Sequence, residues 1–273
     1  MPELPEVEVT RLGVQSKFAG QRLSAVQVRQ PRLRKPVPTD ALTRLAGEVL
    51  RGTSRRSKYL LLQFDSAQVM VHLGMSGALR VVPSDSAWQL HEHVQLSFGD
   101  LALRLHDPRR FGSIDCIAAH EDLNAHASIR GLGVEPLTPQ FTPATLYRAS
   151  RGRQQNCKSF LLAGQAVVGV GNIYASESLF RAAIRPGRAA GRLSLQDCER
   201  LHQAIVEVLS EAVAAGGSSL RDFSGVGGEL GHFQTRAFVY DREGQPCRRC
   251  ATPIRRQVHG QRSSFVCFTC QPR

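Results

Sequence analysis

The sequence lacks the features of several protein classes. No apolar run approaches the roughly 20 residues that a membrane-spanning helix needs, and the acidic start MPELPEVEVT has no apolar core of the kind found in signal peptides. Hydrophobic residues form 42% and charged residues 21% of the 273, which excludes a disordered tail, a collagen-like fibre and a coiled coil. We therefore expect a cytoplasmic globular protein without a membrane partner.

Lysine is scarce. Only four lysines occur among 35 basic residues, so 31 are arginines, and the formal net charge is +12. A guanidinium presents a planar fork of donors that matches phosphate oxygens, whereas an ammonium acts as a point charge. A basic, arginine-rich chain indicates a polyanionic partner such as nucleic acid. A high-GC genome that favours arginine codons would give the same excess, spread over a solvated surface.

The seven cysteines form two groups. Three stand alone, as is usual for small buried apolar residues: Cys116, Cys157 and Cys198. The other four form two CxxC pairs separated by sixteen residues, and a hairpin can bring such pairs to one metal ion. A disulfide pairing would need an oxidising compartment. We expect one structural zinc ion, because four protein ligands leave no open position for water; they are Cys247, Cys250, Cys267 and Cys270.

The length predicts two domains, because single cores rarely grow beyond this size. Short β-rich runs separated by turn residues extend from about 20 to 117, as in an antiparallel sandwich or barrel. The preceding PEVEVTRLGVQSKF is more helical, since Pro5, Glu6 and Glu8 suit a first helical turn. Residues 131–147 contain three prolines and three threonines, which suggests a boundary.

Beyond residue 150 the apolar period becomes helical. It is clearest in SLQDCERLHQAIVEVLSEAVAAGG, where Ser194 is a candidate N-cap and Gly216 a candidate stop. The predicted fold class is α+β, with an N-terminal antiparallel β-sandwich and a leading helix. We place this domain at 1–130, a linker at 131–150, a helical domain at 151–235 and a zinc finger at 236–273.

Four short motifs could carry chemistry, and each has an alternative. GVGNIYASES runs from a glycine-rich turn into a helix, which directs free amides and the Asn172 side chain at an anion; it lacks the third glycine of a dinucleotide loop. HDPRRFG places arginines and Phe111 at a strand end, where they could enter a base step or fold back into the core. In HLGMSG, Met75 could lie on a loop or fill the core. In SRRSKYLLL, Lys58 could direct a compact charge at one phosphate or base, or be an ordinary surface cation on a strand.

The N-terminus offers a nucleophile. Removal of Met1 would expose the secondary amine of Pro2, and an α-amino group has a pKa near 8, so much of it is free base at neutral pH. Attack on an aldehyde-level carbon gives an iminium, an electron sink that permits elimination. Glu3 and Glu6 are candidate acid or base partners, although acidic residues after proline are also ordinary at a helix start.

These motifs occur together and in one order. PELPEVE, SKYLLL, HLGMSG, DPRRFG, GVGNIYASESLF and the four-cysteine hairpin ending in QRSSFVCFTCQ run from residue 2 to about 271. In this the chain closely resembles bacterial formamidopyrimidine-DNA glycosylases. The related endonuclease VIII branch, which acts on oxidised pyrimidines, typically opens PEGPE rather than PELPE and is the alternative. A non-enzymatic, zinc-dependent DNA-binding protein is a further one.

The resemblance implies an activity and a set of roles. Members are bifunctional glycosylase/lyases that remove oxidised purines such as 8-oxoguanine from duplex DNA through a proline Schiff base and β,δ-elimination. They use no cofactor beyond zinc and act as monomers. The implied catalytic residues are Pro2, Glu3, Lys58 and Arg262, the last two through phosphates near the lesion. The implied DNA-binding residues are Glu6, Met75, His91, Arg109, Phe111, Arg153, Lys158 and Asn172.

Within that set, Met75, Arg109 and Phe111 match the residues that fill the gap left by the extruded nucleotide. The loop near 218–231 corresponds to one that closes over the extruded base. The chain also departs from the family pattern: Val9 replaces a threonine, Ala163 and Gly164 stand where an acidic residue is usual, and Asp241 replaces the glycine of a common Tyr-Gly-Arg. These departures bear on lesion preference and on loop dynamics rather than on reaction class.

Overall fold

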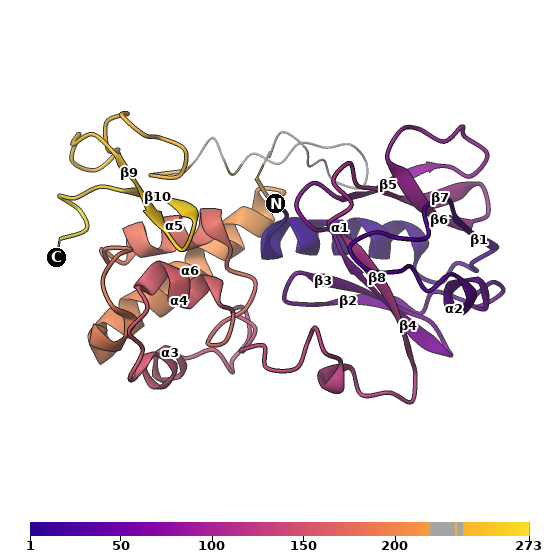
Figure 1. The fold of residues 1–273 in the computed structure, drawn as a ribbon, viewed down its shortest axis with the longest axis horizontal. Helices are drawn as coiled ribbons and strands as arrows, with labels where there is room; N and C mark the ends of the chain where they lie inside the picture. The colour runs from indigo at the N-terminus through magenta and orange to yellow at the C-terminus, as the bar shows by residue number, and fades with distance from the viewer. Residues whose placement is uncertain (219–232, 234–236, 273) are drawn as a thin grey trace. The chain divides into compact units, whose positions relative to one another are not determined.

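The structure is a computed structural model that describes residues 1–218, 233 and 237–272. Two compact units make up the chain. Among the described residues, unit 1 comprises 1–130 and 215–218, and unit 2 comprises 131–214, 233 and 237–272. The α+β class predicted from the sequence is confirmed, with sheets in unit 1 and helices with a small hairpin in unit 2 (Figure 1).

Unit 1 is a sandwich of two four-stranded antiparallel sheets, ordered β1-β6-β7-β5 and β2-β3-β4-β8. The first sheet contains β1 Ala25–Val28, β5 Ala78–Pro83, β6 Glu92–Phe98 and β7 Leu101–His106. The second contains β2 Gly52–Arg56, β3 Tyr59–Gln63, β4 Ala67–His72 and β8 Ser113–Ala118. Besides the longer helix α1, the unit contains two short helical segments: α2 Thr39–Thr43 and the 3-10 turn η1 Leu123–Ala125.

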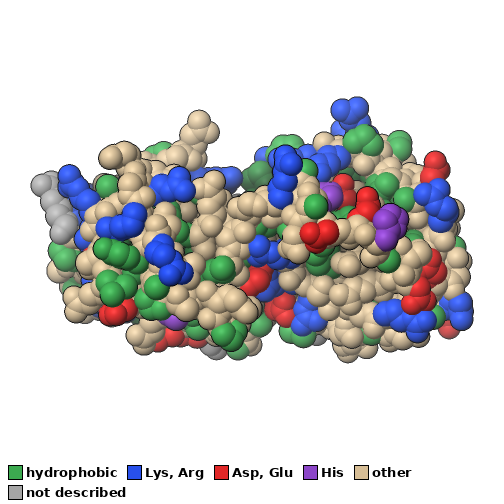
Figure 2. Space-filling model, turned by 90° about the horizontal axis from the view of Figure 1, so that it is seen from below, with side chains coloured by type: hydrophobic (Ala, Val, Ile, Leu, Met, Phe, Trp, Pro, Cys, Tyr) green, Lys and Arg blue, Asp and Glu red, His purple; other side chains and the backbone are tan. Residues whose placement is uncertain are grey.

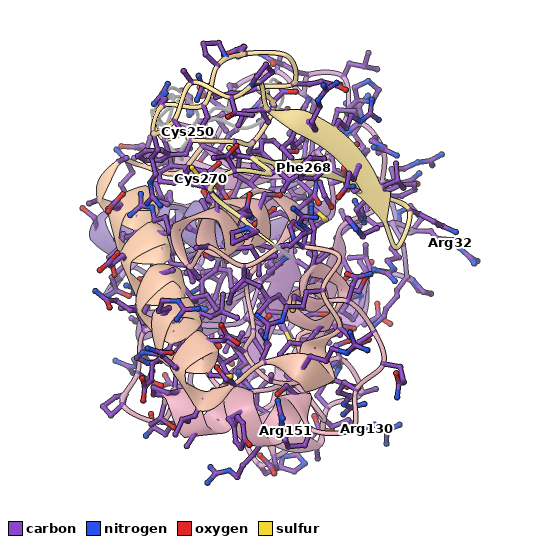
Figure 3. The ribbon with its side chains drawn as sticks, turned by 90° about the vertical axis from the view of Figure 1, so that its left-hand side faces the viewer. Arg32, Arg130, Arg151, Cys250, Phe268 and Cys270 are labelled. Atoms are coloured by element: carbon purple, nitrogen blue, oxygen red, sulfur yellow. The ribbon has the colours of Figure 1, made fainter. Side chains whose placement is uncertain are left out.

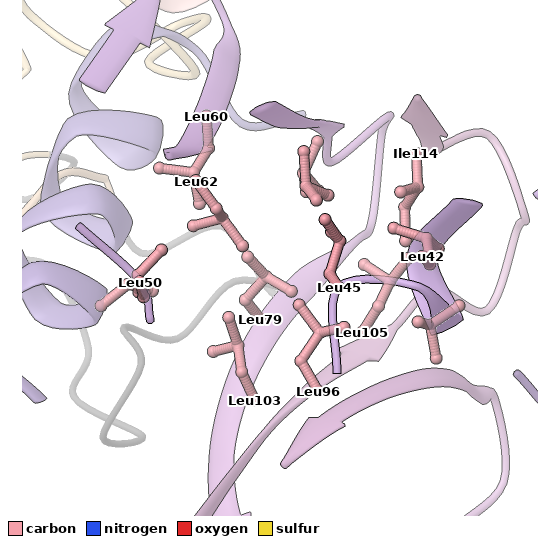
Figure 4. Packing of buried hydrophobic residues seen from close by; sticks show 14 of the residues in the cluster. Leu42, Leu45, Leu50, Leu60, Leu62, Leu79, Leu96, Leu103, Leu105 and Ile114 are labelled. Atoms are coloured by element: carbon pink, nitrogen blue, oxygen red, sulfur yellow. The ribbon is translucent and has the colours of Figure 1, made fainter. Parts of the chain in front are cut away.

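The core of unit 1 is built by aliphatic side chains from both sheets. Leu62 and Ile114 come from one sheet, and Leu79, Leu96 and Leu103 come from the other (Figure 4). All five are at most 6% exposed. Burial of one such side chain contributes about 1.5–3 kcal/mol. This cluster therefore supplies the main stabilisation of the unit and forms the base on which its loops rest.

Helix α1, Leu4–Phe18, begins and ends as its sequence predicts. Glu3 is its N-cap, and the Glu3 and Glu6 side chains each accept the other residue's backbone N–H in a capping box. The helix packs on β2 and β3 and buries Val14 and Phe18. The cap therefore sets where the chain's first residues lie relative to the sandwich.

Strand β2 is a strand of unit 1 that the sequence did not reveal. Its residues GTSRR are polar and lack the alternation of a half-buried strand. Polar contacts with α1 hold it instead: Arg55 Nε lies 3.0 Å from Glu8 Oε2, and the Thr53 N–H donates to Gln15 Oε1 at 2.7 Å. Only the folded helix supplies these partners.

Unit 2 contains four α-helices among its described residues: α3 Pro143–Ser150, α4 Cys157–Leu162, α5 Asn172–Arg181 and α6 Leu195–Ala214, with the 3-10 turn η2 Ala190–Arg192 between the last two. The caps of α6 match expectation, because Ser194 Oγ accepts the Asp197 N–H at 3.0 Å and Gly216 has a φ of 77°. Helix α3 lies inside the segment expected to be a linker and packs on α6. No helix among the described residues is long and apolar enough to cross a membrane.

The hairpin of unit 2 pairs β9 Arg255–His259 with β10 Arg262–Val266. Gly260 and Gln261 form its two-residue turn, with φ values of 54° and 61°. Two left-handed residues give the turn the twist that antiparallel strands need. Arg262 is therefore the first residue of β10 and lies at the tip of the hairpin, where it is exposed.

Candidate functional site

The first residues of the chain bring three predicted site residues together. Pro2 is buried, and the Glu3 and Glu6 side chains are 1% and 0% exposed. Beyond the capping box, Glu6 Oε1 accepts the Ser218 N–H and its Oγ–H, both at 2.8 Å. Residue 218 begins the loop expected over the base; the rest of it, 219–231, lies outside the described residues. The buried Pro2 therefore directly precedes Glu3, and the Glu6 carboxylate binds the N–H of the peptide bond that joins them.

Lys58 lies in the tight turn between β2 and β3, after Ser57 with its φ of 56°. Thr53 contacts Gln15 near the end of α1, and Arg55 contacts Glu8 nearer its start. The last residues of β2 therefore lie closer to the start of α1 than the first ones do. The turn with Lys58 follows at that end. Burial alone would raise the pKa of Glu8, but hydrogen bonds and charge from Arg11 and Arg55 outweigh it and hold that pKa below its ordinary value.

Met75, Arg109 and Phe111 lie on two adjacent loops that cross from one sheet to the other. Residues 73–77 connect β4 to β5, and residues 107–112 connect β7 to β8. A Cβ added to Gly74, whose φ is +65°, would lie only 2.5 Å from the Phe111 carbonyl carbon. The Arg109 guanidinium lies 4.7 Å from the centroid of the Phe111 ring. Phe111 is 44% exposed, so the alternative in which it folds into the core is wrong.

His91 and His72 border these loops. His91 is exposed in the turn before β6, with a φ of 68°, and its carbonyl accepts the Asp107 N–H at 2.9 Å. His72 ends β4, and its Nδ1 accepts the Gly74 N–H at 3.0 Å. Burial, followed by the charges of Lys58 and Arg34, lowers the pKa of His72 to about 4. The ring is therefore neutral at physiological pH and fixed in one tautomer.

In unit 2, Asn172 is the first residue of α5, after Gly171 at the N-cap. Its Oδ1 is buried and has no hydrogen-bond partner among the described residues. A cavity of about 340 Å³ opens at this helix start. It is lined by Asn172, Tyr240, Asp241, Glu243, Arg256, Ser263 and Phe265. A helix N-terminus and a guanidinium at one cavity favour an anion, whereas the two carboxylates oppose one.

Lys158 and Arg153 have opposite surroundings. Lys158 is 0% exposed, and its Nζ donates to Ser176 Oγ at 3.0 Å and to the Ser263 carbonyl at 2.5 Å. This ammonium therefore connects α4 to α5 and to the strand that begins with Arg262. Arg153 is exposed beyond the end of α3.

The four predicted zinc ligands converge. The sulfur atoms of Cys247, Cys250, Cys267 and Cys270 all lie within 4.8 Å of one another, with two pairs at 3.9 and 3.4 Å. Four thiolates around one zinc ion at the usual Zn–S length would be about 3.8 Å apart. Cys250 and Cys270 come from the loops that precede β9 and follow β10 (Figure 3). This set fits a structural zinc ion held by cysteine alone.

Glu177 is a functional residue that sequence reasoning missed. It is 0% exposed on α5, and its two carboxylate oxygens accept the N–H groups of Phe238, Val239 and Tyr240 at 2.8 to 2.9 Å. It therefore fixes the segment that leads into the zinc ligands. An acidic residue within the apolar sequence IYASESLF was the available signal, because a buried carboxylate needs several donors.

On the face in Figure 2, the basic side chains do not merge into one patch. Lys and Arg side chains are spread over this face, with Asp and Glu side chains between them. Several arginines are engaged within the protein, such as Arg104 with Glu92 at 2.9 Å and Arg181 with Glu211 at 2.5 Å. Total charge is therefore a weaker guide to the partner than the individual sites described above.

Comparison with known proteins decides the family. Family models match three stretches: the formamidopyrimidine-DNA glycosylase N-terminal domain at 1–114, its H2TH domain at 132–224, and a zinc finger found in FPG and IleRS at 244–273. The chain belongs to the formamidopyrimidine-DNA glycosylase family. Relatives of that name include one from Herminiimonas arsenicoxydans, 53% identical over 99% of this chain and 100% of the relative. Another, from Aromatoleum aromaticum, is 54% identical over 100% of both.

Solved structures agree with this family. Fpg from Lactococcus lactis, in a complex with DNA containing an abasic site, matches with a TM-score of 0.92 and 32% identity, over 99% of this chain and 100% of that one. The MutM (FPG) protein of Thermus thermophilus matches with a TM-score of 0.89 and 37% identity, over 99% and 98%. The protein is accordingly a base excision repair DNA glycosylase for oxidised purines, with a structural zinc ion and DNA as its partner.

Proposed function

We propose that the N-terminal amine of Pro2, exposed once Met1 is removed, is the nucleophile of this glycosylase. It attacks C1′ of the damaged nucleoside and displaces the oxidised purine. Cleavage of the bond between C1′ and the ring oxygen then gives an iminium. The iminium acts as the electron sink when a C–H proton is removed in each elimination, and the 3′ phosphate leaves in the β-step and the 5′ phosphate in the δ-step. The observation that carries the proposal is the burial of Pro2 beside two carboxylates, Glu3 and Glu6.

The carboxylates have separate tasks. Glu3 transfers protons during opening of the sugar ring. Glu6 holds Glu3 through the capping box and joins α1 to Ser218. Lys58, at the turn next to the start of α1, contacts a backbone phosphate near the lesion.

The exposed loops of unit 1 extrude the nucleotide. Phe111 and Met75 enter the base stack, and Arg109, stacked on Phe111, faces the cytosine left unpaired. Unstacking and unpairing the damaged nucleotide costs a few kcal/mol, as in base flipping generally. His91 contacts the backbone beside this group.

Unit 2 binds the backbone. Asn172 and the amides at the start of α5 bind one phosphate, and Arg262 at the hairpin tip binds another. Arg153 adds a surface contact. Lys158 serves the lesion region from inside, because its ammonium fixes Ser263, the residue after Arg262. The zinc ion stiffens this hairpin.

Borohydride trapping tests the proposal. Protein whose mass shows loss of one methionine and gain of one zinc should give a covalent adduct with an 8-oxoguanine·C duplex. Pro2→Gly should give none. Selective cutting of thymine glycol would favour the endonuclease VIII alternative, and salt-sensitive binding without scission of any lesion would favour a non-enzymatic DNA-binding protein.

We further propose that the enzyme acts as a monomer in the bacterial cytoplasm, associated with the nucleoid through DNA. Bacterial relatives and a DNA partner support this location. Light scattering of the purified protein at micromolar concentration should give a mass near 30.0 kDa, and a value twice as large would contradict the monomer.

A further inference from the structure

Asp107 occupies the point where the two crossing loops of unit 1 meet. It follows β7 directly and is 0% exposed. The β4–β8 ladder ends at the pair of His72 and Ser113, and the β5–β7 ladder ends at Ala78 and His106. Strand pairing therefore stops on both sides of the loops that carry Met75, Arg109 and Phe111. Asp107 lies in the gap between these ladder ends.

The side chain of Asp107 joins the two loops. Oδ1 accepts the Ser76 Oγ–H at 3.1 Å, next to Met75, and Oδ2 accepts the Gly112 N–H at 2.7 Å, next to Phe111. Both partners are buried, so loss of either hydrogen bond would carry the free-energy cost of a buried polar group without a partner.

The main chain of Asp107 reaches the turn that carries His91. Its N–H donates to the His91 carbonyl at 2.9 Å, and its own carbonyl accepts from the Arg110 N–H at 3.1 Å and lies 2.8 Å from His93 Nε2. One residue thus contacts three segments, each adjacent to a side chain that we place on DNA.

We infer that Asp107 is a positioning residue for base extrusion, which holds Met75, Phe111 and His91 in one fixed arrangement. The inference rests on the proposed function of those side chains. Nothing in the arrangement places Asp107 on DNA, because its carboxylate is enclosed by protein donors. It acts by preorganisation: a misplacement of about 1 Å can cost on the order of 100-fold in rate.

The chemistry of the carboxylate gives the test a conservative variant. Asparagine can accept the Gly112 N–H through Oδ1 and donate to Ser76 Oγ through Nδ2, so it can keep both connections without the charge. Alanine keeps neither. Positioning by hydrogen bonds therefore predicts rescue by Asp107→Asn, whereas a role that needs the charge predicts none.

The experiment compares two reactions of the same variants. Single-turnover excision of 8-oxoguanine opposite cytosine requires extrusion of a base, whereas borohydride trapping on a preformed abasic site does not. Asp107→Ala should slow excision by about 10- to 100-fold, with trapping within about threefold of wild type. Asp107→Asn should excise within about threefold of wild type. The matched control is Asp115→Ala, whose side chain pairs with Lys35 at 3.6 Å.

Several results would overturn the inference: wild-type excision by Asp107→Ala, equal losses in excision and trapping, or an Asn variant as slow as Ala. If Asp107→Ala does not fold, Ser76→Ala decides, since it removes one connection only. It should slow excision by about 3- to 10-fold with trapping unchanged, and wild-type excision would overturn the inference. Failure of the wild-type protein to trap would instead refute the Pro2 mechanism.

Discussion

Unit 1 and the zinc module, residues 237–272, support their functional loops on very different foundations. Among the described residues, the loops of unit 1 rest on a cluster of 23 buried apolar residues. The corresponding cluster at the module has six, of which Phe180 lies on α5 and five belong to the module, including the zinc ligands Cys247 and Cys267. Each region is also held by a buried carboxylate that accepts several hydrogen bonds: Asp107 within unit 1, and Glu177 of α5, which binds N–H groups of the module. A large apolar core stabilises the fold, so polar contacts serve mainly to position the loops. A small core supplies too little stability by itself, and a bound metal adds the rest.

Removal of a zinc ligand should have the largest effect. In Cys250→Ala, three thiolates remain, and we expect metal content to fall below about 0.1 zinc per chain, because a structural site needs its full ligand set. Lesion binding should be abolished, since the hairpin with Arg262 loses its support. Metal analysis and amide exchange over 237–272 measure the effect. Cys116→Ala, on β8, is the matched control, and wild-type binding by the metal-free variant would contradict a scaffold role.

Acid should affect unit 1 through His72. Its pKa of about 4 in the folded protein lies below the ordinary 6.5. The unfolded chain therefore takes up the proton first, and stability falls as the pH drops from about 6.5 toward 4, by up to about 3 kcal/mol. Above that window His72 contributes no pH dependence.

Thermal unfolding of wild type and His72→Gln across this range measures the contribution. The difference in stability between them should change with pH in the variant's favour as the solution is acidified. His120→Gln, an exposed residue of the same unit, should show no such change. Parallel curves for wild type and His72→Gln would refute the prediction.

The carboxylate of Glu177 should matter less than the metal, although it serves the same module. Glu177→Gln loses one of the two acceptor oxygens that serve three N–H groups, which costs about 1–3 kcal/mol of local stability. Zinc should pass to a chelator faster, and exchange at Phe238–Tyr240 should rise, while unit 1 stays unchanged. Glu199→Gln, exposed on α6, is the control. An unchanged release rate would mean that zinc alone holds this segment.

The smallest effect should come from Asp241, one of the departures from the family pattern. It has a φ of 59° and places a carboxylate at the cavity beside Asn172. Asp241→Gly and Asp241→Asn both remove this charge, so each should tighten DNA binding by about 1 kcal/mol or less at low salt. Only the glycine variant also removes the conformational free-energy cost of the left-handed backbone at residue 241. Binding at two salt concentrations separates the contributions, and weaker binding by both variants would show that the carboxylate assists.

Several elements could be predicted from the sequence because their signals are local. Short β-rich runs separated by turn residues predicted β1 and β3 to β8 in unit 1, proline with acidic residues predicted the start of α1, and Ser194 predicted the start of α6. The spacing of the cysteines predicted the zinc site. Strand β2 has no such signal, since its partners lie on α1. Helix α3 lies where proline and threonine suggested a linker, although Pro143 and the Thr142 N-cap are helix-start residues.

The sequence by itself determined the class of fold, the metal and, through ordered motifs, the family. Only the tertiary structure decided which polar side chains face inward. The resemblance implied Lys158 as a DNA-binding residue, but its ammonium is enclosed and bonds to Ser263. Asp107 and Glu177, which the sequence did not single out, join separate segments. Periodicity and ligand spacing depend on neighbours along the chain. The position of a buried charge depends instead on donors and acceptors from distant segments, which come together only on folding.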